Sequence, residues 1–356
     1  MDRSDQPKHT RPGAGRAAHT YAAIDLGTNN CRLLVAKPDG DGFRVTDAFS
    51  RIVRLGEGLV ATNRLSDLAM ERTVEALRVC AGKVRRSGAS RVRAVATEAC
   101  RRAENGDEFV VRAFRESGIQ LEIIETLEEA HLALTGCAPL YNAPADDNDS
   151  YALLFDIGGG STQVTWLRLD QPSPGCAHPD FTVLGSVSLP CGVVTLSEKF
   201  EAVETADGEV SLDAYKRVCD HVGELLEPFE REYGIAAHVA AGRVQMVGTS
   251  GTVTTLTGVL LDLPRYNRAR VDGRGLTFDE IIQGRNQLMA LDRSGRAAHP
   301  CIGPQRADLV VVGCAVLNAI CDAWPVGKLR VADRGLREGI LHGLMRDADR
   351  EAALAG

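Results

Sequence analysis

Hydrophobic positions in the first half of the chain switch between the spacing typical of strands and that typical of helices. Two apolar runs around a short glycine-containing turn, residues 21–36, predict a β-hairpin, and residues 42–50 alternate as a third strand. From Ser66, which suits a helix N-cap, apolar residues recur at helical spacing. The other segments read as strands over 91–97 and 121–125 and as helices over 107–117 and 126–136. The predicted order is βββαβαβα.

The second half repeats this pattern, beginning with another hairpin over residues 151–167. The segments after it read as strands over 181–189, 243–250 and 328–333, and as helices within 212–233, from Thr252 on to Cys321, and after Gly335. We therefore predict an α/β protein with two similar βββαβαβα domains and a cleft between them. Its predicted parts are a disordered lead-in over residues 1–19, domain I over 20–140, a linker rich in Pro, Asn and Asp over 141–150, and domain II over 151–356.

Each predicted hairpin has an aspartate near the end of its first apolar strand, directly before a glycine-containing turn. A carboxylate in such a place is costly to desolvate unless a cation or hydrogen-bond donors meet it. Asp25 precedes the turn that holds Gly27, Thr28 and Asn29. Asp156 precedes a turn made of Gly158, Gly159, Gly160, Ser161 and Thr162. Glycines there let the backbone approach a ligand closely.

A third glycine-rich loop follows a predicted strand and opens a predicted helix. It consists of Gly248, Thr249, Ser250, Gly251 and Thr252. Backbone N–H groups at a helix N-terminus can bind an anion, but the same residues also form an ordinary turn with an N-cap. This loop alone leaves both readings open. Together, the three loops predict a cleft that holds phosphate oxygens from two sides.

Composition and charge narrow the class of protein. The 356 residues are 44% hydrophobic and 25% charged, which is ordinary for a soluble globular chain. No apolar run approaches the roughly 20 residues that span a bilayer, and residues 1–19 lack the apolar core of a signal peptide. The ten cysteines are scattered without metal-ligand spacing, so we expect reduced, buried thiols in the cytoplasm. The net charge of −7 argues against a broad nucleic-acid surface.

Six stretches of the chain carry a resemblance to a known family. They are AAIDLGTNNCRLLVA, AVATEACRRAENGDEF, IETLEEAHLAL, LLFDIGGGSTQV, VGTSGTVTTL and ADRGLREGIL. Together they resemble the exopolyphosphatase and guanosine pentaphosphate phosphatase (Ppx/GppA) family of the actin, sugar-kinase and Hsp70 superfamily. The resemblance implies hydrolysis of the terminal phosphoanhydride of polyphosphate, of guanosine pentaphosphate or of both, with Mg²⁺. It also implies an actin-like ATPase (ribonuclease H-like) fold and a homodimer. The apolar pattern and the net charge, by themselves, predict no membrane or nucleic-acid partner.

By the same resemblance, Glu129 is the residue that positions or deprotonates the attacking water, and Arg101 clamps phosphate. Neighbouring side chains on a helix point about 100° apart, so only one of Glu128 and Glu129 can face the cleft. Without the resemblance, two acids early in a helix would be read as stabilising its dipole. A bidentate guanidinium suits phosphate, whereas the neighbouring Arg102 reads as an exposed helix residue.

Metal binding is predicted at Asp156, with Asp25 facing it across the cleft. Where the family often has glutamate after GGGST, this chain has Gln163. An amide oxygen can bind magnesium but brings no negative charge, so we expect a weak metal site that depends on the substrate.

Two other classes of function stay open at this point. One is a kinase of the same superfamily, and the presence of Glu129 argues against it. The other is a sensor that binds polyphosphate or guanosine pentaphosphate without turnover, and Gln163 makes that reading less remote.

Overall fold

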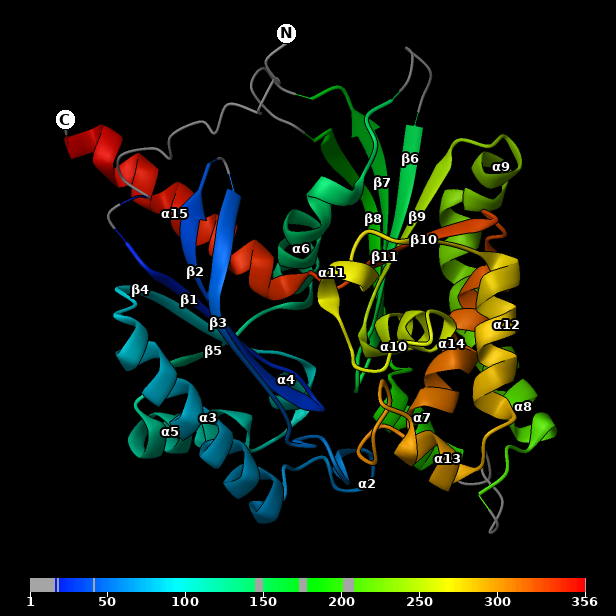
Figure 1. Cartoon of the computed structure of the whole chain (residues 1–356), viewed down its shortest axis with the longest axis horizontal. Helices are drawn as coiled ribbons and strands as arrows, with labels where there is room; N and C mark the ends of the chain where they lie inside the picture. Colours follow the sequence, from blue (N-terminus) through cyan, green and yellow to red (C-terminus); the bar gives the residue numbers. More distant parts are fainter. Residues whose placement is uncertain are drawn as a thin grey trace, which may run out of the picture.

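The chain folds into two lobes that lie side by side, each built around one sheet (Figure 1). This description rests on a computed structural model, which describes residues 17, 19–40, 42–144, 150–172, 178–200 and 208–355. The predicted lead-in falls almost entirely outside these residues, and so does the middle of the predicted linker.

The first lobe has a five-stranded sheet in the order β3-β2-β1-β4-β5. Its strands are β1 (Tyr21–Leu26), β2 (Asn30–Asp39), β3 (Gly42–Ile52), β4 (Arg91–Ala96) and β5 (Leu121–Ile123). The first three strands pair antiparallel and the others parallel. Its helices are α2 (Leu59–Thr62), α3 (Asp67–Ser87), α4 (Glu98–Arg102), α5 (Gly106–Ser117) and α6 (Thr126–Cys137). The Ser66 side chain caps α3 by accepting a hydrogen bond from the backbone of Ala69, as its place in the sequence predicts.

The second lobe has a six-stranded sheet in the order β10-β11-β9-β6-β7-β8. Its strands are β6 (Ser150–Ile157), β7 (Thr162–Asp170), β8 (Asp180–Leu189), β9 (Val244–Thr249), β10 (Gly275–Thr277) and β11 (Lys328–Ala332). Its helices are α7 (Val193–Lys199), α8 (Leu212–Tyr233), α9 (Ile235–Ala240), α10 (Gly251–Leu260), α11 (Arg268–Val271), α12 (Phe278–Met289), α13 (Arg293–Ala298) and α14 (Val310–Ala323). Strand β10 extends the sheet beyond the predicted set.

The two lobes repeat one another down to the register of their hairpins. Asp25 stands opposite Arg32 in the first hairpin, and Asp156 stands opposite Gln163 in the second. Each third strand then carries a bulge at the matching place: Thr46 of β3 is the extra residue opposite the step from Val35 to Ala36, and Leu184 of β8 is the extra residue opposite the step from Trp166 to Leu167. The predicted repetition is therefore present in the structure, and Arg32 and Gln163 occupy equivalent positions.

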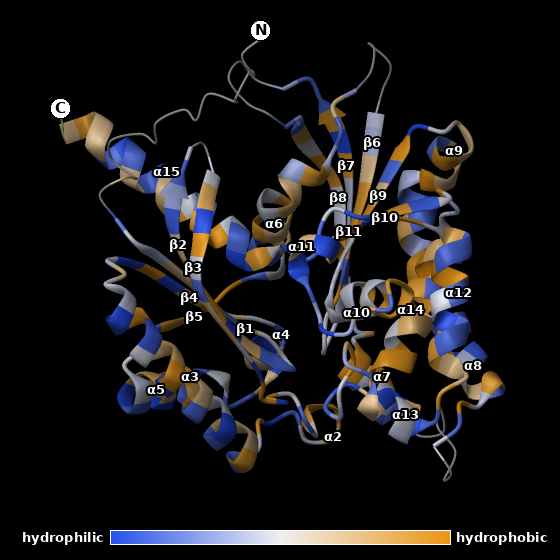
Figure 2. Ribbon diagram, viewed as in Figure 1, coloured by the Kyte–Doolittle hydropathy of each residue, from blue (hydrophilic) through white to orange (hydrophobic). Residues whose placement is uncertain are grey.

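Alternate residues of each central strand face different helices. In β1, Ala22, Ile24 and Leu26 pack in one apolar cluster with α3 and α5, whereas Tyr21 and Ala23 pack in another. Hydrophobic residues, orange in Figure 2, follow the strands of both sheets and helix α14. The nine described cysteines are unpaired, and all but Cys219 are buried. Among the described helices, none is long and apolar enough to cross a membrane.

The last helix, α15 (Leu336–Ala355), follows β11 of the second sheet but packs on the first lobe, against α6 and β1. Leu336, Ile340 and Leu341 join the apolar cluster that contains Tyr21. The predicted range of domain II, 151–356, therefore does not describe where this helix packs. Its apolar side chains cover the face of the first sheet that α3 and α5 leave open.

Close contact between α6 and α15 depends on glycine. A Cβ atom at Gly339 would lie 1.9 Å from the carbonyl oxygen of Leu132. Gly343 is on the same helix with nothing within 4 Å of such an atom. We expect Gly339→Ala to lower the free energy of unfolding by about 2 kcal/mol or more, because backbone must move. Gly343→Ala should raise it by about 0.5–1 kcal/mol through helix propensity. Urea denaturation checks both, and equal effects would contradict the packing described.

Candidate active site

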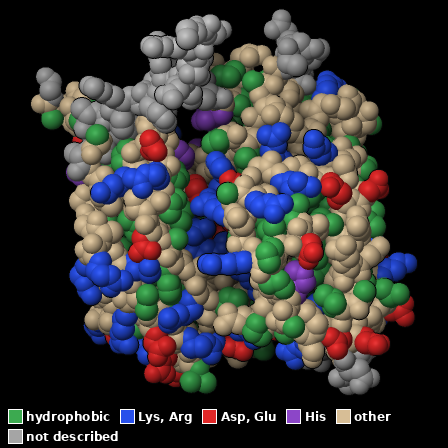
Figure 3. All heavy atoms as spheres, in the orientation of Figure 1, with side chains coloured by type: hydrophobic (Ala, Val, Ile, Leu, Met, Phe, Trp, Pro, Cys, Tyr) green, Lys and Arg blue, Asp and Glu red, His purple; other side chains and the backbone are tan. Residues whose placement is uncertain are grey.

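A cavity of about 460 Å³ lies between the lobes and is lined by residues of both. The predicted residues that line it are Gly27, Thr28, Asn29, Glu129, Asp156, Gly158, Gly159, Gly160, Ser161, Gln163, Thr249, Ser250, Gly251 and Thr252. Figure 3 shows Lys and Arg side chains, in blue, gathered along the hollow between the lobes. Three loops that are far apart in the sequence thus meet at one place.

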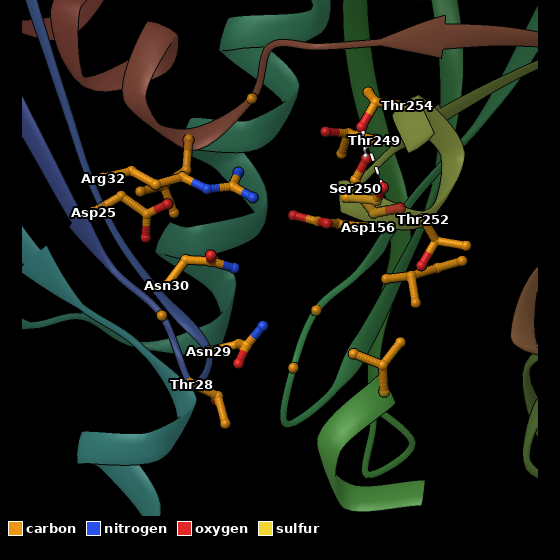
Figure 4. Close-up of a pocket in the computed structure, with 18 of the residues that line it drawn as sticks. Asp25, Thr28, Asn29, Asn30, Arg32, Asp156, Thr249, Ser250, Thr252 and Thr254 are labelled. Atoms are coloured by element: carbon orange, nitrogen blue, oxygen red, sulfur yellow. Dashed lines mark hydrogen bonds between the residues drawn. The ribbon is translucent and has the colours of Figure 1, made fainter. Parts of the chain in front are cut away.

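The turn between β1 and β2 supplies the first loop. The Gly27 N–H donates to the Asn30 carbonyl at 2.9 Å, which closes the turn. Thr28 and Asn29 are buried, and the Oδ1 atoms of Asn29 and Asn30 have no hydrogen-bond partner among the residues that the structure describes. Asn29 and Asn30 point from the first lobe toward the second in Figure 4. Buried amide groups without partners indicate a place for a polar ligand.

The turn between β6 and β7 faces this first loop across the cleft. A Cβ atom at Gly159 would lie 3.1 Å from the side chains of Thr28 and Asn29, so the approach of the lobes here depends on glycine. Thr162 does not line the cavity, because its hydroxyl donates to the Cys191 carbonyl at 2.8 Å. Thr162 therefore stabilises the turn without lining the cavity.

The third loop joins β9 to α10. Ser250 caps α10 by accepting a hydrogen bond from the Val253 N–H at 3.1 Å, and Thr249 donates to the Arg334 carbonyl at 2.9 Å. The loop is thus an N-capped turn that also lines the cavity, and anion binding by it stays a prediction. Gly248 lies outside the cavity, within β9, where a Cβ atom would come within 2.5 Å of the Phe155 ring. Its role is packing.

Glu129 reaches the cavity from the first turns of α6, whereas Glu128 points outward to Arg93. Burial raises the pKa of Glu129 to about 7. Arg101 opposes this shift in the pKa, and the charges of Asp156 and Asp25 add to it. A carboxyl that titrates near neutrality suits proton transfer at physiological pH.

Arg101 does not line the cavity. Its Nη1 donates to the Ile124 carbonyl at 2.6 Å. Its Nη2 donates to Glu98 Oε2 at 2.8 Å and to Glu129 Oε2 at 3.1 Å. In this structure Arg101 therefore binds carboxylates, and the phosphate contact expected of it stays a prediction.

Asp25 and Asp156 end their strands in the cleft, where Figure 4 shows them on opposite sides. Burial raises the pKa of Asp156 to about 7, with Arg32 opposing and Asp25 adding to the shift. Burial also raises the pKa of Asp25, and Arg32 and Arg337 oppose this. The cost of burying these carboxyls is thus only partly offset by nearby arginines.

A hard divalent cation fits the residues around Asp156. Gln163 stands directly opposite Asp156 in the β6–β7 pair, so the two side chains share one face of the sheet. Among the described residues Gln163 Nε2 has no hydrogen-bond partner, so the amide can present its oxygen to a cation and its Nε2 donor to a phosphate oxygen. The described residues contain no group of three or more His, Cys, Asp or Glu placed to hold a metal ion. Substrate oxygens or water would have to complete the shell.

Sequence reasoning did not single out Arg32, Arg306 and Arg337, which also line the cavity. Burial lowers the pKa of Arg306, and the charge of Arg32 lowers it further. Neither Arg32 nor Arg337 forms an ion pair with any described residue. The position of Arg32 opposite Asp25 in the hairpin was a usable signal. The local sequence contains no such signal for Arg306, because this residue lies on an irregular segment before α14.

A family model described as the Ppx/GppA phosphatase family matches residues 34–348. The chain belongs to this family. Its fold is the predicted one, since each half of the chain repeats βββαβαβα and the structural relatives below share the architecture.

A guanosine-5'-triphosphate,3'-diphosphate pyrophosphatase of Aeromonas hydrophila is 29% identical over 325 residues. The match covers 91% of this chain and 59% of that protein, so the chain spans about three fifths of its length. The crystal structure of an exopolyphosphatase-like protein has 29% identity and a TM-score of 0.77, covering 92% of this chain and 98% of the other. The Aquifex aeolicus Ppx/GppA phosphatase has 26% identity and a TM-score of 0.68, with 92% and 99% covered.

The raised pKa of Glu129 predicts how the free energy of unfolding depends on pH. Between its ordinary value of 4.5 and about 7, the folded protein keeps a proton that the unfolded chain has lost. Stability therefore falls as pH rises through this window. The side chain in Glu129→Gln cannot titrate. The part of the decrease in unfolding free energy that comes from Glu129, up to roughly 3 kcal/mol, should therefore be absent in this variant. The free energy of unfolding is measured by urea denaturation between pH 5 and pH 8 without added metal.

Glu122→Gln is the control, because Glu122 belongs to an exposed ion pair. Identical pH profiles for Glu129→Gln and wild type would contradict the burial argument.

Proposed function

We propose that the protein is a magnesium-assisted phosphoanhydride hydrolase that removes the terminal phosphate of inorganic polyphosphate or of guanosine pentaphosphate. Its place in a phosphatase family and the names of its relatives support the reaction class. The single observation that carries the proposal is a buried carboxylate, Glu129, beside three loops suited to phosphate.

Glu129 is arranged to take a proton from water. Arg101 holds its Oε2 atom, and Oε1 forms no hydrogen bond with any residue that the structure describes. Oε1 is therefore free to accept a proton from a water molecule as that water attacks the terminal phosphorus. The bond between this phosphorus and the bridging oxygen breaks, and no covalent intermediate with the protein is needed.

The loops and the arginines divide the work of binding. Backbone N–H groups and hydroxyls of the loops at Thr28, Ser161 and Thr252 can donate to the oxygens of the terminal phosphate. Arg32, Arg306 and Arg337 supply the positive charge that a chain of phosphates needs, in a protein of net charge −7. When bound, Mg²⁺ would be held by Asp156 and Gln163 and would neutralise charge on the transferred phosphate.

A phosphate-release assay tests the function. The purified protein is given long-chain polyphosphate, guanosine pentaphosphate and ATP, each with Mg²⁺. Release from either of the first two substrates supports the proposal, and their relative rates rank the substrates. Phosphate transfer from ATP to an acceptor would indicate a kinase. Tight binding of either phosphate ligand without turnover would indicate a sensor.

Replacement of Glu129 separates it from its neighbour. We expect Glu129→Gln to lower kcat by roughly 10² or more with little change in KM, because general bases contribute about that much. Glu128→Gln is the control, since Glu128 points out of the cavity to Arg93. Steady-state phosphate release measures both variants. A larger loss in the Glu128 variant would reverse the assignment.

Substitutions at the proposed metal site should change the magnesium requirement in opposite directions. Asp156→Asn should nearly abolish metal-dependent activity. Gln163→Glu should lower the Mg²⁺ concentration for half-maximal rate, because it adds a charge opposite Asp156. Magnesium titrations of activity, with calorimetry of Mg²⁺ binding, measure this. An unchanged or higher requirement in Gln163→Glu would mean that Gln163 serves the phosphate through its Nε2 donor.

A further inference from the structure

A second carboxylate lines the cavity beside Glu129. Glu98, the first residue of α4, lines the same cavity, and its Oε2 accepts a hydrogen bond from Arg101 Nη2 at 2.8 Å. The same nitrogen donates to Glu129 Oε2 at 3.1 Å. One guanidinium nitrogen therefore serves two carboxylates that belong to different helices.

The three side chains form a confined group. The side chains of Arg101, Glu98 and Glu129 are 16%, 23% and 17% exposed. Arg101 cannot turn freely, because its Nη1 also donates to the Ile124 carbonyl. Glu98 reaches the second lobe as well, since a Cβ atom at Gly160 would lie 3.1 Å from Glu98 Cγ. Glu98 is therefore one of three groups that hold the Arg101 guanidinium, together with the Ile124 carbonyl and Glu129.

We propose that Glu98 is a positioning residue for the reaction. It binds the same Arg101 nitrogen as Glu129 and helps to fix the guanidinium. By drawing on the positive charge of Arg101, Glu98 keeps Arg101 from fully neutralising the Glu129 carboxylate. This inference rests on the proposed function, in which Glu129 takes the proton of water. Glu98 itself transfers no proton. It keeps the hydrogen bond from Arg101 to Glu129 weak enough for Glu129 to remain a strong base.

The charges around Glu129 make the effect of Glu98 predictable. The groups that face it are Arg101 and Glu98 on α4, Asp25 at the end of β1, and Asp156 at the end of β6. Arg101 is the cation among them. If Glu98 loses its charge, Arg101 interacts more strongly with Glu129, whose pKa should then fall. A lower pKa makes a weaker base and a slower reaction.

Glu98→Gln tests this, because it keeps the shape of the side chain and removes the charge. Glu122→Gln is the matched control, since Glu122 pairs with Arg93 in the same lobe at an exposed site. We expect Glu98→Gln to lower kcat about tenfold, to leave KM within about twofold, and to move the acid limb of the pH profile to lower pH. The control should behave like wild type.

A second measurement does not depend on activity. The Glu129 carboxyl is titrated by NMR in protein with ¹³C-labelled glutamate, and its signal is identified by its loss in Glu129→Gln. Its pKa should be lower in Glu98→Gln than in wild type and unchanged in Glu98→Asp, which keeps the charge. Glu98→Ala gives the same measurement if the Gln variant does not fold. If wild type releases no phosphate, the proposed function fails while this titration still tests Glu98. An unchanged Glu129 titration, or wild-type kcat in Glu98→Gln, would overturn the inference.

Discussion

Helix α6 brings three carboxylates together because it lies between the two sheets. Its Leu132 packs in the apolar cluster of the first sheet, and its Ala133 and Leu134 pack in a cluster of the second. Asp25 lies on the same face of β1 as Tyr21 and Ala23, and Asp156 on the same face of β6 as Ala152 and Leu154, because side chains alternate along a strand. Both aspartates therefore face the helix that carries Glu129. The chemistry of the cleft follows from this convergence of like charges.

Burying like charges together is costly, and the surrounding residues reduce the cost only in part. Arg101 pairs with Glu129, and Arg32 lies near both aspartates, yet the pKa values of Glu129 and Asp156 still rise to about 7. If each of these carboxylates were paired with a cation, the cluster would be more stable, but no carboxylate would remain to act as a general base. The backbone also contributes, because glycines at the contacts between the lobes allow the two sides of the cavity to approach each other closely.

Local sequence was informative where functional residues lie on a glycine-containing tight turn or on a capped loop before a helix. The turns after Asp25 and Asp156 and the capped loop at Ser250 were identifiable because turn geometry demands particular residues. Thr162 and Gly248 were grouped with their neighbours, but along a strand successive residues alternate in direction, and both lie outside the cavity. Glu98 and Arg306 were missed because nothing in their local sequence separates them from ordinary surface charges.

The sequence by itself determined the repeated order of strands and helices, the two aspartate turns and the family, because each depends on local periodicity or on contiguous motifs. Only the tertiary structure decided that α15 packs on the first sheet and that β10 extends the second. It also decided which of two adjacent acids faces the cavity and that Arg101 binds Glu98 and Glu129. These features join residues far apart in the chain, and their energies come from burial and charge in the assembled cleft.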